Sequence, residues 1–397
     1  MTIYDKIQKK EMRDIMKSIG IIAEYNPFHN GHLYHINEIK KKYPDHIIIL
    51  VMTGNFSQRG IPSIIDKFKR CEIALLHGID LVVELPFPFS TQSADYFSYG
   101  AITILEKLNC EKVIFGSESN NIETLELIAK TQVNNPEFER LVKIYSKFGN
   151  NYPTSISKAI YDLTNKKIDT PNDLLGISYI KTIISNNYNI KYETIKRLDN
   201  YHDIELNDEL SSATSIRAAL KNNIDISKQV PVDTLNYFND LHFIDDYFDI
   251  LKYKIITEED LTTYNTVEEG IVKLLKKKIN NVSNYDELIK SVKSKRYTYN
   301  KISRMLLHIL CNFTKDKKDL FNKISYLRIL GFNDLGKSYL NSIKKNIDIP
   351  IISKITREKD KMLEYELYTT EIYNIINKSS KKEEESIIYL GGKNDKK

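Results

Sequence analysis

Two histidines three residues apart, His29 and His32, lie in a polar turn directly after an apolar run of strand type. The turn also carries Pro27, which restricts φ, and Gly31, which lets a backbone approach a ligand closely. A helix that begins at this turn points free N–H groups and a positive dipole end at any anion above it. Both imidazoles would then share one helix face and could donate hydrogen bonds to phosphate oxygens. His35 lies one turn further on.

An H-x-x-H pair by itself has other interpretations. It can be a polar helix start with incidental histidines, and this is the better interpretation when the pair stands alone. It can also be part of a metal site, but the spacing suggests no third ligand, so no metal-ligating residue is predicted. The phosphate interpretation gains support from the position of the pair, because the first strand, a proline, a glycine and both histidines meet in one turn.

The surrounding elements predict the scaffold that holds this turn. Apolar runs predict strands over 19–25, 46–53, 79–85 and 111–116, and helices are expected over 31–42, 63–77, 93–108 and 121–133. These four strands are nearly continuous runs rich in Ile and Val, which is typical of strands buried on both faces of a parallel sheet. A further strand-like stretch follows at 190–196. The predicted fold class is therefore α/β, with a doubly wound, Rossmann-like parallel sheet. Such sheets bind ligands beyond the carboxyl ends of their strands, where strand order reverses.

The chain is long enough for two or three domains. After about residue 225 the sequence is mostly helical and rich in lysine, and we expect the boundary near 225–233. The predicted organisation is an N-terminal extension over 1–17, a nucleotide-binding domain over 18–225 and a mainly helical, basic domain over 226–397. The extension is polar and lacks the apolar core of a signal peptide.

Composition narrows the function classes. The net charge of +5 is a mild basic excess that is compatible with an anionic partner. The three cysteines are far apart and form no C-x-x-C pair, which argues against a disulfide framework or a zinc knuckle. The longest apolar run, 47–52, is too short to cross a bilayer. These features predict a cytoplasmic protein without a membrane partner, and they do not determine an oligomeric state.

The motifs resemble those of a known superfamily. H-x-G-H after the first strand is the signature of the nucleotidyltransferase superfamily, which includes pantetheine-phosphate adenylyltransferase and the class I aminoacyl-tRNA synthetases. The stretch "SSATSIRAAL" is similar to the I-S-S-T-x-I-R motif of the small-molecule adenylyltransferases. A KMSKS-like lysine loop is absent, which counts against a synthetase. In this superfamily the first motif binds the ATP phosphates and stabilises the transition state at the α-phosphorus.

A longer series of motifs is more specific. "EYNPFHNGHLYH", "MTGNFSQRG", "DLVVELPF", "FGSES", "PNDLLGISY" and "SATSIR" follow in this order, and together they resemble the bacterial tRNA(Met) cytidine acetate ligase family over most of residues 19–330. The resemblance implies activation of acetate with ATP, through acetyl-adenylate with release of pyrophosphate. It further implies acetylation of N4 of the wobble cytidine in elongator tRNA(Met).

The same resemblance implies the site residues. Catalysis would rest on His29, His32 and Arg217. ATP would contact Ile22, Ala23, Glu24, Tyr25, Asn26, Pro27, Phe28, His29, Asn30, Gly31, His32, Leu33, Tyr34 and His35, and further Gly116, Asn172, Arg197, Leu198 and Ser215. Taken alone, Gly116 would be a strand-end turn and Asn172 a helix N-cap.

The side chains suit the implied chemistry. Attack of an acetate oxygen on the α-phosphorus needs positioning and charge stabilisation more than a proton-transfer base. We expect Mg²⁺ on the phosphates, although no acidic cluster would hold it alone, because Mg²⁺ commonly relies on phosphate oxygens and water. Acetyl transfer then requires the wobble base to be exposed or flipped out. The sequence does not show which group, if any, deprotonates the cytidine amine.

The loop after the second strand should face the same crevice. Asn55, Gln58 and Arg59 are therefore candidates for the acetate or cytidine pocket. The residues that follow include Asp66, Lys67 and Arg70. They would form an ordinary surface helix with an Asp66–Arg70 pair if the segment has no function.

A basic stretch in the second half is the candidate RNA-binding segment. It has no acidic residue between its cations and carries tyrosines that could stack on unpaired bases. The alternative is a solvated helix face with core tyrosines. The predicted RNA contacts are Lys293, Lys295, Arg296, Tyr297, Tyr299, Lys301 and Arg304.

Two other functions remain open from the residues. A small-molecule adenylyltransferase would explain the two nucleotide motifs but not the basic helical half. An RNA-binding module with a vestigial nucleotide site would make both histidines dispensable.

Overall fold

The computed structural model describes residues 16–198, 206, 211–294, 297–355, 360–376, 383 and 387–391. Its strands are β1 (Ser18–Ala23), β2 (Ile47–Thr53), β3 (Leu81–Leu85), β4 (Lys112–Ser117), β5 (Lys191–Lys196), β6 (Leu327–Asn333), β7 (Ile351–Ile352) and β8 (Ile388–Leu390). The first five strands match the predicted ranges to within two residues at either end. Within the part of the chain described, these eight strands form one sheet, and the predicted α/β fold class is confirmed.

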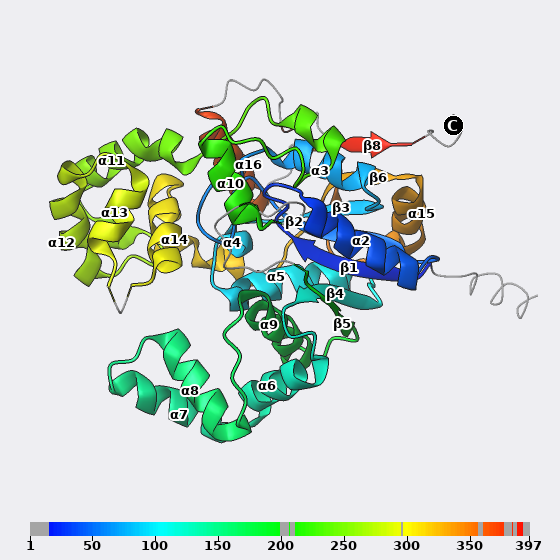
Figure 1. The fold of residues 1–397 in the computed structure, drawn as a ribbon, viewed down its shortest axis with the longest axis horizontal. Coiled ribbons are helices and arrows are strands. Elements are labelled where there is room, and N and C mark those ends of the chain that lie inside the picture. The colour runs from blue at the N-terminus through cyan, green and yellow to red at the C-terminus, as the bar shows by residue number, and fades with distance from the viewer. Residues whose placement is uncertain are drawn as a thin grey trace, which may run out of the picture.

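The α-helices surround this sheet and build a separate bundle (Figure 1). They are α2 (Asn30–Lys42), α3 (Lys67–Leu76), α4 (Phe87–Ser90), α5 (Ala94–Lys107), α6 (Ile122–Asn134), α7 (Pro136–Lys147), α8 (Tyr152–Thr164), α9 (Pro171–Ser185), α10 (Ala213–Lys221), α11 (Phe248–Thr257), α12 (Glu269–Lys278), α13 (Tyr285–Val292), α14 (Tyr299–Leu310), α15 (Asp334–Ile343) and α16 (Lys361–Asn374). No helix in the described part is long and apolar enough to cross a membrane.

The strand order is β5-β4-β1-β2-β3-β6-β7, with β8 paired to β6. Strands β1 to β5 are mutually parallel. The chain builds outward from β1 through β2 to β3 and then crosses to β4 on the other side of β1. This crossing places a switch point between β1 and β4, and ligands bind outside the carboxyl ends of strands at such a point. The turn with the histidine pair follows β1 and therefore lies at the switch point.

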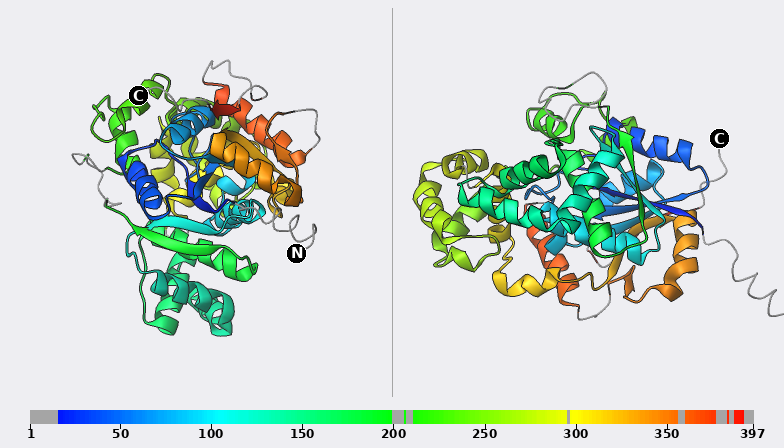
Figure 2. Two further views of the ribbon diagram at one scale, coloured as in Figure 1. Left: turned by 90° about the vertical axis from the view of Figure 1, so that its right-hand side faces the viewer. Right: turned by 90° about the horizontal axis from the view of Figure 1, so that it is seen from below.

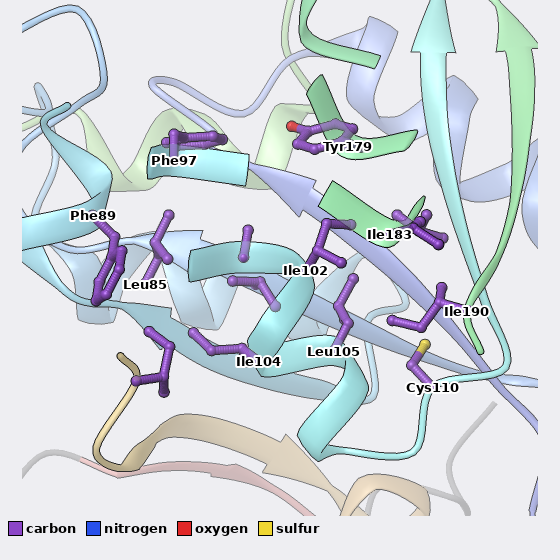
Figure 3. Packing of buried hydrophobic residues seen from close by; sticks show 14 of the residues in the cluster. Leu85, Phe89, Phe97, Ile102, Ile104, Leu105, Cys110, Tyr179, Ile183 and Ile190 are labelled. Carbon is purple, nitrogen blue, oxygen red and sulfur yellow. The ribbon is translucent and has the colours of Figure 1, made fainter. Parts of the chain in front are cut away.

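Alternate residues of β2 enter two different cores. Ile47, Ile49 and Val51 pack with α5, α9 and α15 on one face, while Ile48 and Leu50 pack with α2 and α3 on the other. All seven residues of β2 are buried, which explains why the strand is a continuous apolar run. Figure 3 shows part of the first core, where α5 and α9 side chains interdigitate beside the strands.

The second half of the chain does not form only a helical domain. Helices α11 to α14 pack into a bundle around their own apolar core (Figure 1). The chain then returns to the sheet, where β6 pairs antiparallel with β3, with Leu81 opposite Phe332. Our sequence analysis did not anticipate β6, β7 or β8. In the first half, α7 and α8 form a hairpin that projects from the body of the molecule (Figure 2).

The loop–helix segment after β2 is not the surface helix that was offered as an alternative. Lys67 and Arg70 are fully buried, and Asp66 caps α3 by accepting from Phe68 N and Lys69 N at 2.9 Å each. Nζ of Lys67 lies 2.7 Å from Glu84 Oε1 and 3.8 Å from Glu366 Oε1, and it also contacts Glu383. This buried ion cluster ties α3 and β3 to the C-terminal part of the chain.

Arg70 joins the ends of β1 and β2. Its Nη1 donates to the carbonyl of Glu24 at 2.6 Å, its Nη2 donates to the carbonyl of Gly54, and its Nε donates to Ile65 O at 3.0 Å. Burial lowers the pKa of Arg70, although Tyr373 and nearby carboxylates oppose this shift. The guanidinium therefore fixes two loops that both reach the switch point.

His308 of α14 lies at the junction between the bundle and α4, and it is fully buried. Its Nε2 lies 3.1 Å from Thr91 O, and its Nδ1 lies 3.3 Å from Asn265 O. Burial lowers the pKa of His308 to about 4, against the opposing effect of the carbonyl contacts. The imidazole is therefore neutral at neutral pH.

This burial predicts an acid-sensitive junction. The folded pKa of His308 is below the unfolded value near 6.5, so the unfolded state binds more protons between about pH 6.5 and 4. Stability is fully present above this window and falls as pH decreases through it, by about 1.4 kcal/mol per pH unit from this group. Urea unfolding at several pH values should give a shallower acid slope for His308→Gln than for the wild type. Equal slopes would contradict the prediction.

Candidate active site

A pocket of about 340 Å³ opens at the carboxyl ends of β1 and β4. It gathers most of the residues predicted to bind the nucleotide. Those that line it are Ile22, Ala23, Glu24, Tyr25, Asn26, His29, Gly31, His32, Tyr34, His35, Gly116, Asn172, Arg197, Leu198 and Arg217. The predicted residues that do not line it are Pro27, Phe28, Asn30, Leu33 and Ser215, which shape the turn or the start of α10 instead.

The histidine pair forms the N-terminal cap of α2. Gly31 N donates to Nδ1 of His29 at 3.1 Å, and His29 N donates to Nδ1 of His32 at 3.3 Å. The two rings stack with centroids 3.7 Å apart. Because each Nδ1 accepts a hydrogen bond, the Nε2 of each ring is the nitrogen that carries a proton. The pair therefore offers two Nε2–H donors beside the first turn of a helix, which suits a phosphate group.

The surroundings of His32 and His35 lower the pKa of both imidazoles. Burial, together with the neighbouring His29, Arg197 and His35, holds the pKa of His32 well below its usual range. Burial and Arg197 lower the pKa of His35 to about 4. Nε2 of His35 and the hydroxyl of Tyr25 are buried, and no described residue is hydrogen-bonded to either atom. Unpaired polar atoms at a pocket wall indicate a place for a polar ligand.

Arg217 reaches the same turn from α10. Its Nη1 donates to Asn26 O at 2.6 Å, and its Nη2 donates to Thr214 Oγ1 at 3.2 Å. Arg59 donates to the same hydroxyl at 2.7 Å, so a guanidinium group from the loop after β2 and one from α10 meet at one threonine. Ser215 is buried at the start of α10, where its hydroxyl donates to Ser212 O at 2.9 Å.

The opposite end of the pocket is built around α9. Asn172 Nδ2 donates to Glu118 Oε1 at 2.6 Å, and Asn172 Oδ1 accepts from Arg197 Nη1 at 3.4 Å. A Cβ on Gly116 would lie 3.2 Å from Cγ of Arg197, so the glycine leaves room for this arginine. Phe115 and the side chains of α9 add apolar walls. This end combines apolar side chains with amide and guanidinium groups, which suits a nucleoside.

Of the three candidate residues in the loop after β2, two line the pocket and one does not. Gln58 and Arg59 line the pocket, and their assignment to an acetate or cytidine subsite stays a prediction. Asn55 lies elsewhere, because its Oδ1 accepts from Lys67 N at 3.0 Å and its Nδ2 donates to Thr370 Oγ1 at 3.2 Å. Asn55 therefore supports the buried ion cluster rather than the pocket wall.

Several pocket residues were missing from the sequence predictions. Thr214 lies inside the quoted "SATSIR" motif and could have been found there. Glu118, in "FGSES", does not line the pocket itself but accepts from Asn172, which does, and this contact depends on the fold. Asn300 lines the pocket from α14, on the far side of the domain boundary, and nothing in the sequence places it there.

The candidate RNA-binding residues have mixed surroundings. Tyr297 is buried and donates to Glu268 at 3.0 Å, Lys301 pairs with the same carboxylate at 2.8 Å, and Tyr299 donates to Asp286 at 2.7 Å. Lys293 follows α13, and Lys295 and Arg296 lie outside the described residues. The acids that contact Tyr297, Tyr299 and Lys301 come from neighbouring segments of the bundle.

Arg304 differs from these neighbours. It is partly buried on α14, and its Nη1 lies 3.5 Å from Gln58 O. Burial lowers its pKa to about 10, and no described carboxylate forms an ion pair with it. Gly60 packs so closely on this helix that a Cβ added to it would lie 2.4 Å from Arg304 N. The loop after β2 is therefore in direct contact with the backbone of α14.

Comparison with known proteins agrees with this geometry. A family model described as HIGH Nucleotidyl Transferase matches residues 16–386. The tRNA(Met) cytidine acetate ligase of Anoxybacillus flavithermus is 39% identical, covering 90% of this chain and 94% of its own length. The enzyme of the same name from Clostridium novyi is 40% identical, covering 92% and 96%.

Solved structures are similar over nearly the whole chain. The apo crystal structure of Thermotoga maritima TmcAL superposes with a TM-score of 0.88 at 29% identity, covering 95% of this chain and 100% of that one. The crystal structure of TmcAL bound with alpha-thio ATP gives a TM-score of 0.85 at 28% identity, with the same coverage. The chain therefore belongs to the HIGH nucleotidyl transferase family and, within it, to the tRNA(Met) cytidine acetate ligases.

Proposed function

We propose that this protein is an ATP-dependent tRNA(Met) cytidine acetate ligase. It activates acetate as acetyl-adenylate, releases pyrophosphate and transfers the acetyl group to N4 of the wobble cytidine of elongator tRNA(Met). The observation that carries the proposal is the convergence of the His29–His32 cap, Arg217 and the loop after β2 on one pocket, in a chain that matches the named relatives over nearly their full length. ATP and tRNA are cytoplasmic, and we expect the enzyme to act there.

Charge in the pocket favours this chemistry. Among the described lining residues, the cations Arg59, Lys196, Arg197 and Arg217 face a single carboxylate. A cationic pocket attracts a triphosphate and stabilises the negative charge that develops as pyrophosphate leaves. Nε2–H of His29 and His32 would donate to phosphate oxygens near the reacting phosphorus, and Arg217 with Arg59 would hold the leaving pyrophosphate.

The nucleoside would occupy the other end of the pocket. Asn172 and Arg197 would contact its polar groups, and Phe115 would supply an apolar wall. Acetate would then enter from the side of Gln58, with one oxygen in line with the bond to the leaving group. The lowered pKa of His32 fits a role as a neutral hydrogen-bond donor, since attack by a carboxylate needs no base.

We expect Mg²⁺ to accompany ATP. No group of three or more His, Cys, Asp or Glu side chains within the described ranges could hold a metal ion. A magnesium ion would therefore be bound chiefly by phosphate oxygens and water, which is common for this metal. It would supply charge neutralisation at the phosphates.

The test of the proposal is an assay of both half-reactions. Purified protein with ATP and acetate should release pyrophosphate, and addition of tRNA(Met) should yield N4-acetylcytidine. Acetate-independent release with another small substrate would favour a small-molecule adenylyltransferase. Binding of tRNA without any pyrophosphate release would favour an RNA-binding module.

We further propose that residues 226–397 include the tRNA-binding surface and that Arg304 contacts an RNA phosphate. A cation without a carboxylate partner is free to neutralise a phosphate, whereas a paired one gains less. Arg304→Gln should weaken tRNA binding and reduce the slope of log K against log salt by about 0.7–0.9. Lys301→Gln on the same helix is the matched control, because Glu268 already pairs with Lys301. Equal slopes in both variants would contradict the assignment.

A further inference from the structure

Glu24 is the one carboxylate among the described residues that line the pocket. The ATP phosphates would repel a carboxylate, so its presence in an otherwise cationic pocket calls for a role in another part of the reaction. It comes directly after β1, two residues before Asn26 and five before His29. The side chain therefore lies at the switch point, next to the turn that would hold the phosphates.

The structure fixes Glu24 at two points. Gln58 N donates to its Oε1 at 2.8 Å, and its main-chain carbonyl accepts from the buried guanidinium of Arg70 at 2.6 Å. No described residue donates to Oε2, and Glu24 is only partly buried. One oxygen thus anchors the side chain, while the other can accept a proton or hydrogen bond from a ligand in the pocket.

Glu24 also lies on the side from which RNA would arrive. The residue that anchors its carboxylate, Gln58, has its carbonyl 3.5 Å from Nη1 of Arg304. Asn300, one turn earlier on α14, lines the same pocket. The path from the bundle to the pocket therefore passes Gln58 and reaches Glu24. Among the described pocket residues, a base entering along this path meets Glu24 as its first possible proton acceptor with a negative charge.

The second half-reaction needs such an acceptor. The exocyclic amine of cytosine is conjugated with the ring and is a weak nucleophile until it loses a proton. A positioned carboxylate can remove that proton as the new bond forms, and general base catalysis of this kind contributes about 10²–10⁴-fold.

We propose that Glu24 is the general base for acetyl transfer to cytidine. N4 attacks the carbonyl carbon of acetyl-adenylate, and the N–C bond forms while its proton passes to Oε2 of Glu24. The bond from the carbonyl carbon to the phosphate oxygen breaks, and AMP leaves with that electron pair. Glu24 then releases the proton to solvent. This assignment rests on the proposed function, because it concerns the second step of that reaction.

The test separates the two steps in Glu24→Gln. Acetate-dependent exchange of pyrophosphate into ATP, without tRNA, reports adenylation. Single-turnover transfer from preformed acetyl-adenylate to tRNA(Met) reports the second step. Glutamine keeps an oxygen that can accept from Gln58 N, so the fold should persist, and thermal unfolding checks this. The transfer rate should fall at least 100-fold more than the exchange rate, and the variant should lose one ionisation from the pH profile of transfer.

Glu123→Gln is the matched control, since it removes an exposed carboxylate on α6 and should change neither rate. Equal losses in both steps of Glu24→Gln would overturn the assignment in favour of a role in nucleotide or metal binding. Unchanged transfer would overturn it as well. The wild type decides the proposed function separately, because a protein without acetate-dependent exchange or without acetylated cytidine fails before the variant is considered.

Discussion

Replacing His32 by alanine should reduce acetate-dependent pyrophosphate release by about 100- to 1,000-fold, the usual effect of losing one donor to a developing charge. Nδ1 of His32 accepts from His29 N, and its ring stacks on that of His29. The substitution therefore removes one Nε2–H donor and also frees its partner ring. Turnover should fall more than ATP affinity, because the donor acts mainly on charge that develops in the transition state.

The measurement is the initial rate of pyrophosphate release at saturating ATP and acetate, with ATP affinity determined separately. His46→Ala is a suitable control, since His46 directly precedes β2. It therefore lies at the amino ends of the strands, away from the pocket, and its ring is 3.6 Å from Glu111. Thermal unfolding of both variants excludes a folding defect. A loss of less than ten-fold in His32→Ala would remove this residue from the catalytic set.

Replacing Lys67 by methionine should destabilise the fold by about 3–5 kcal/mol, the usual cost of leaving buried charges without their partner. Lys67 is fully buried and contacts Glu84, Glu366 and Glu383. Burial, with Glu84 adding to the effect, already raises the pKa of Glu366 well above its usual range, so this carboxyl depends on the lysine to ionise. Methionine keeps much of the side-chain volume but removes the ammonium group that the described carboxylates of the cluster share.

Unfolding in guanidinium chloride would measure the loss of free energy of unfolding in Lys67→Met, with Lys69→Met as the control on the same helix. Lys69 is partly exposed and lies 3.6 Å from Asp66 and 3.9 Å from Asp240. Such surface pairs contribute about 0–1 kcal/mol. A similar small effect in both variants would show that water or protonation of the carboxyl groups compensates for the lost lysine.

The sequence predicted β1 to β4 well because these strands are largely buried on both faces. Ile and Val dominate β1, β2 and β3, and this local signal is enough to locate them. By contrast, β6 contains Arg328 and follows a long helical region, and its position depends on pairing with β3 far away in the chain. No local pattern carries that information, and the return of the chain to the sheet was missed.

The residues of the candidate site likewise include some that a local motif predicts and others that depend on distant parts of the chain. The turn from Ile22 to His35 is contiguous, so a motif could predict it, and most of it lines the pocket. The contribution of Asn300 depends on how the bundle meets the sheet. The burial of Lys67 and Arg70 could not be predicted, because charged residues in a helix are normally exposed and only the fold shows what covers them. Their partners come from distant strands, loops and the C-terminal segment.

The pairing of β6 with β3 has a consequence for synthesis on the ribosome. The two strands are separated by about 240 residues, from Leu85 to Leu327. Translation proceeds at about 5–20 residues per second, so about 12–50 s pass between the synthesis of β3 and the synthesis of β6. During this interval the nascent sheet presents an unpaired edge, which is a place where chains can join wrongly. We therefore expect a chaperone to shield the unpaired edge of β3 during this interval. Premature termination before β6 would leave that edge unpaired permanently.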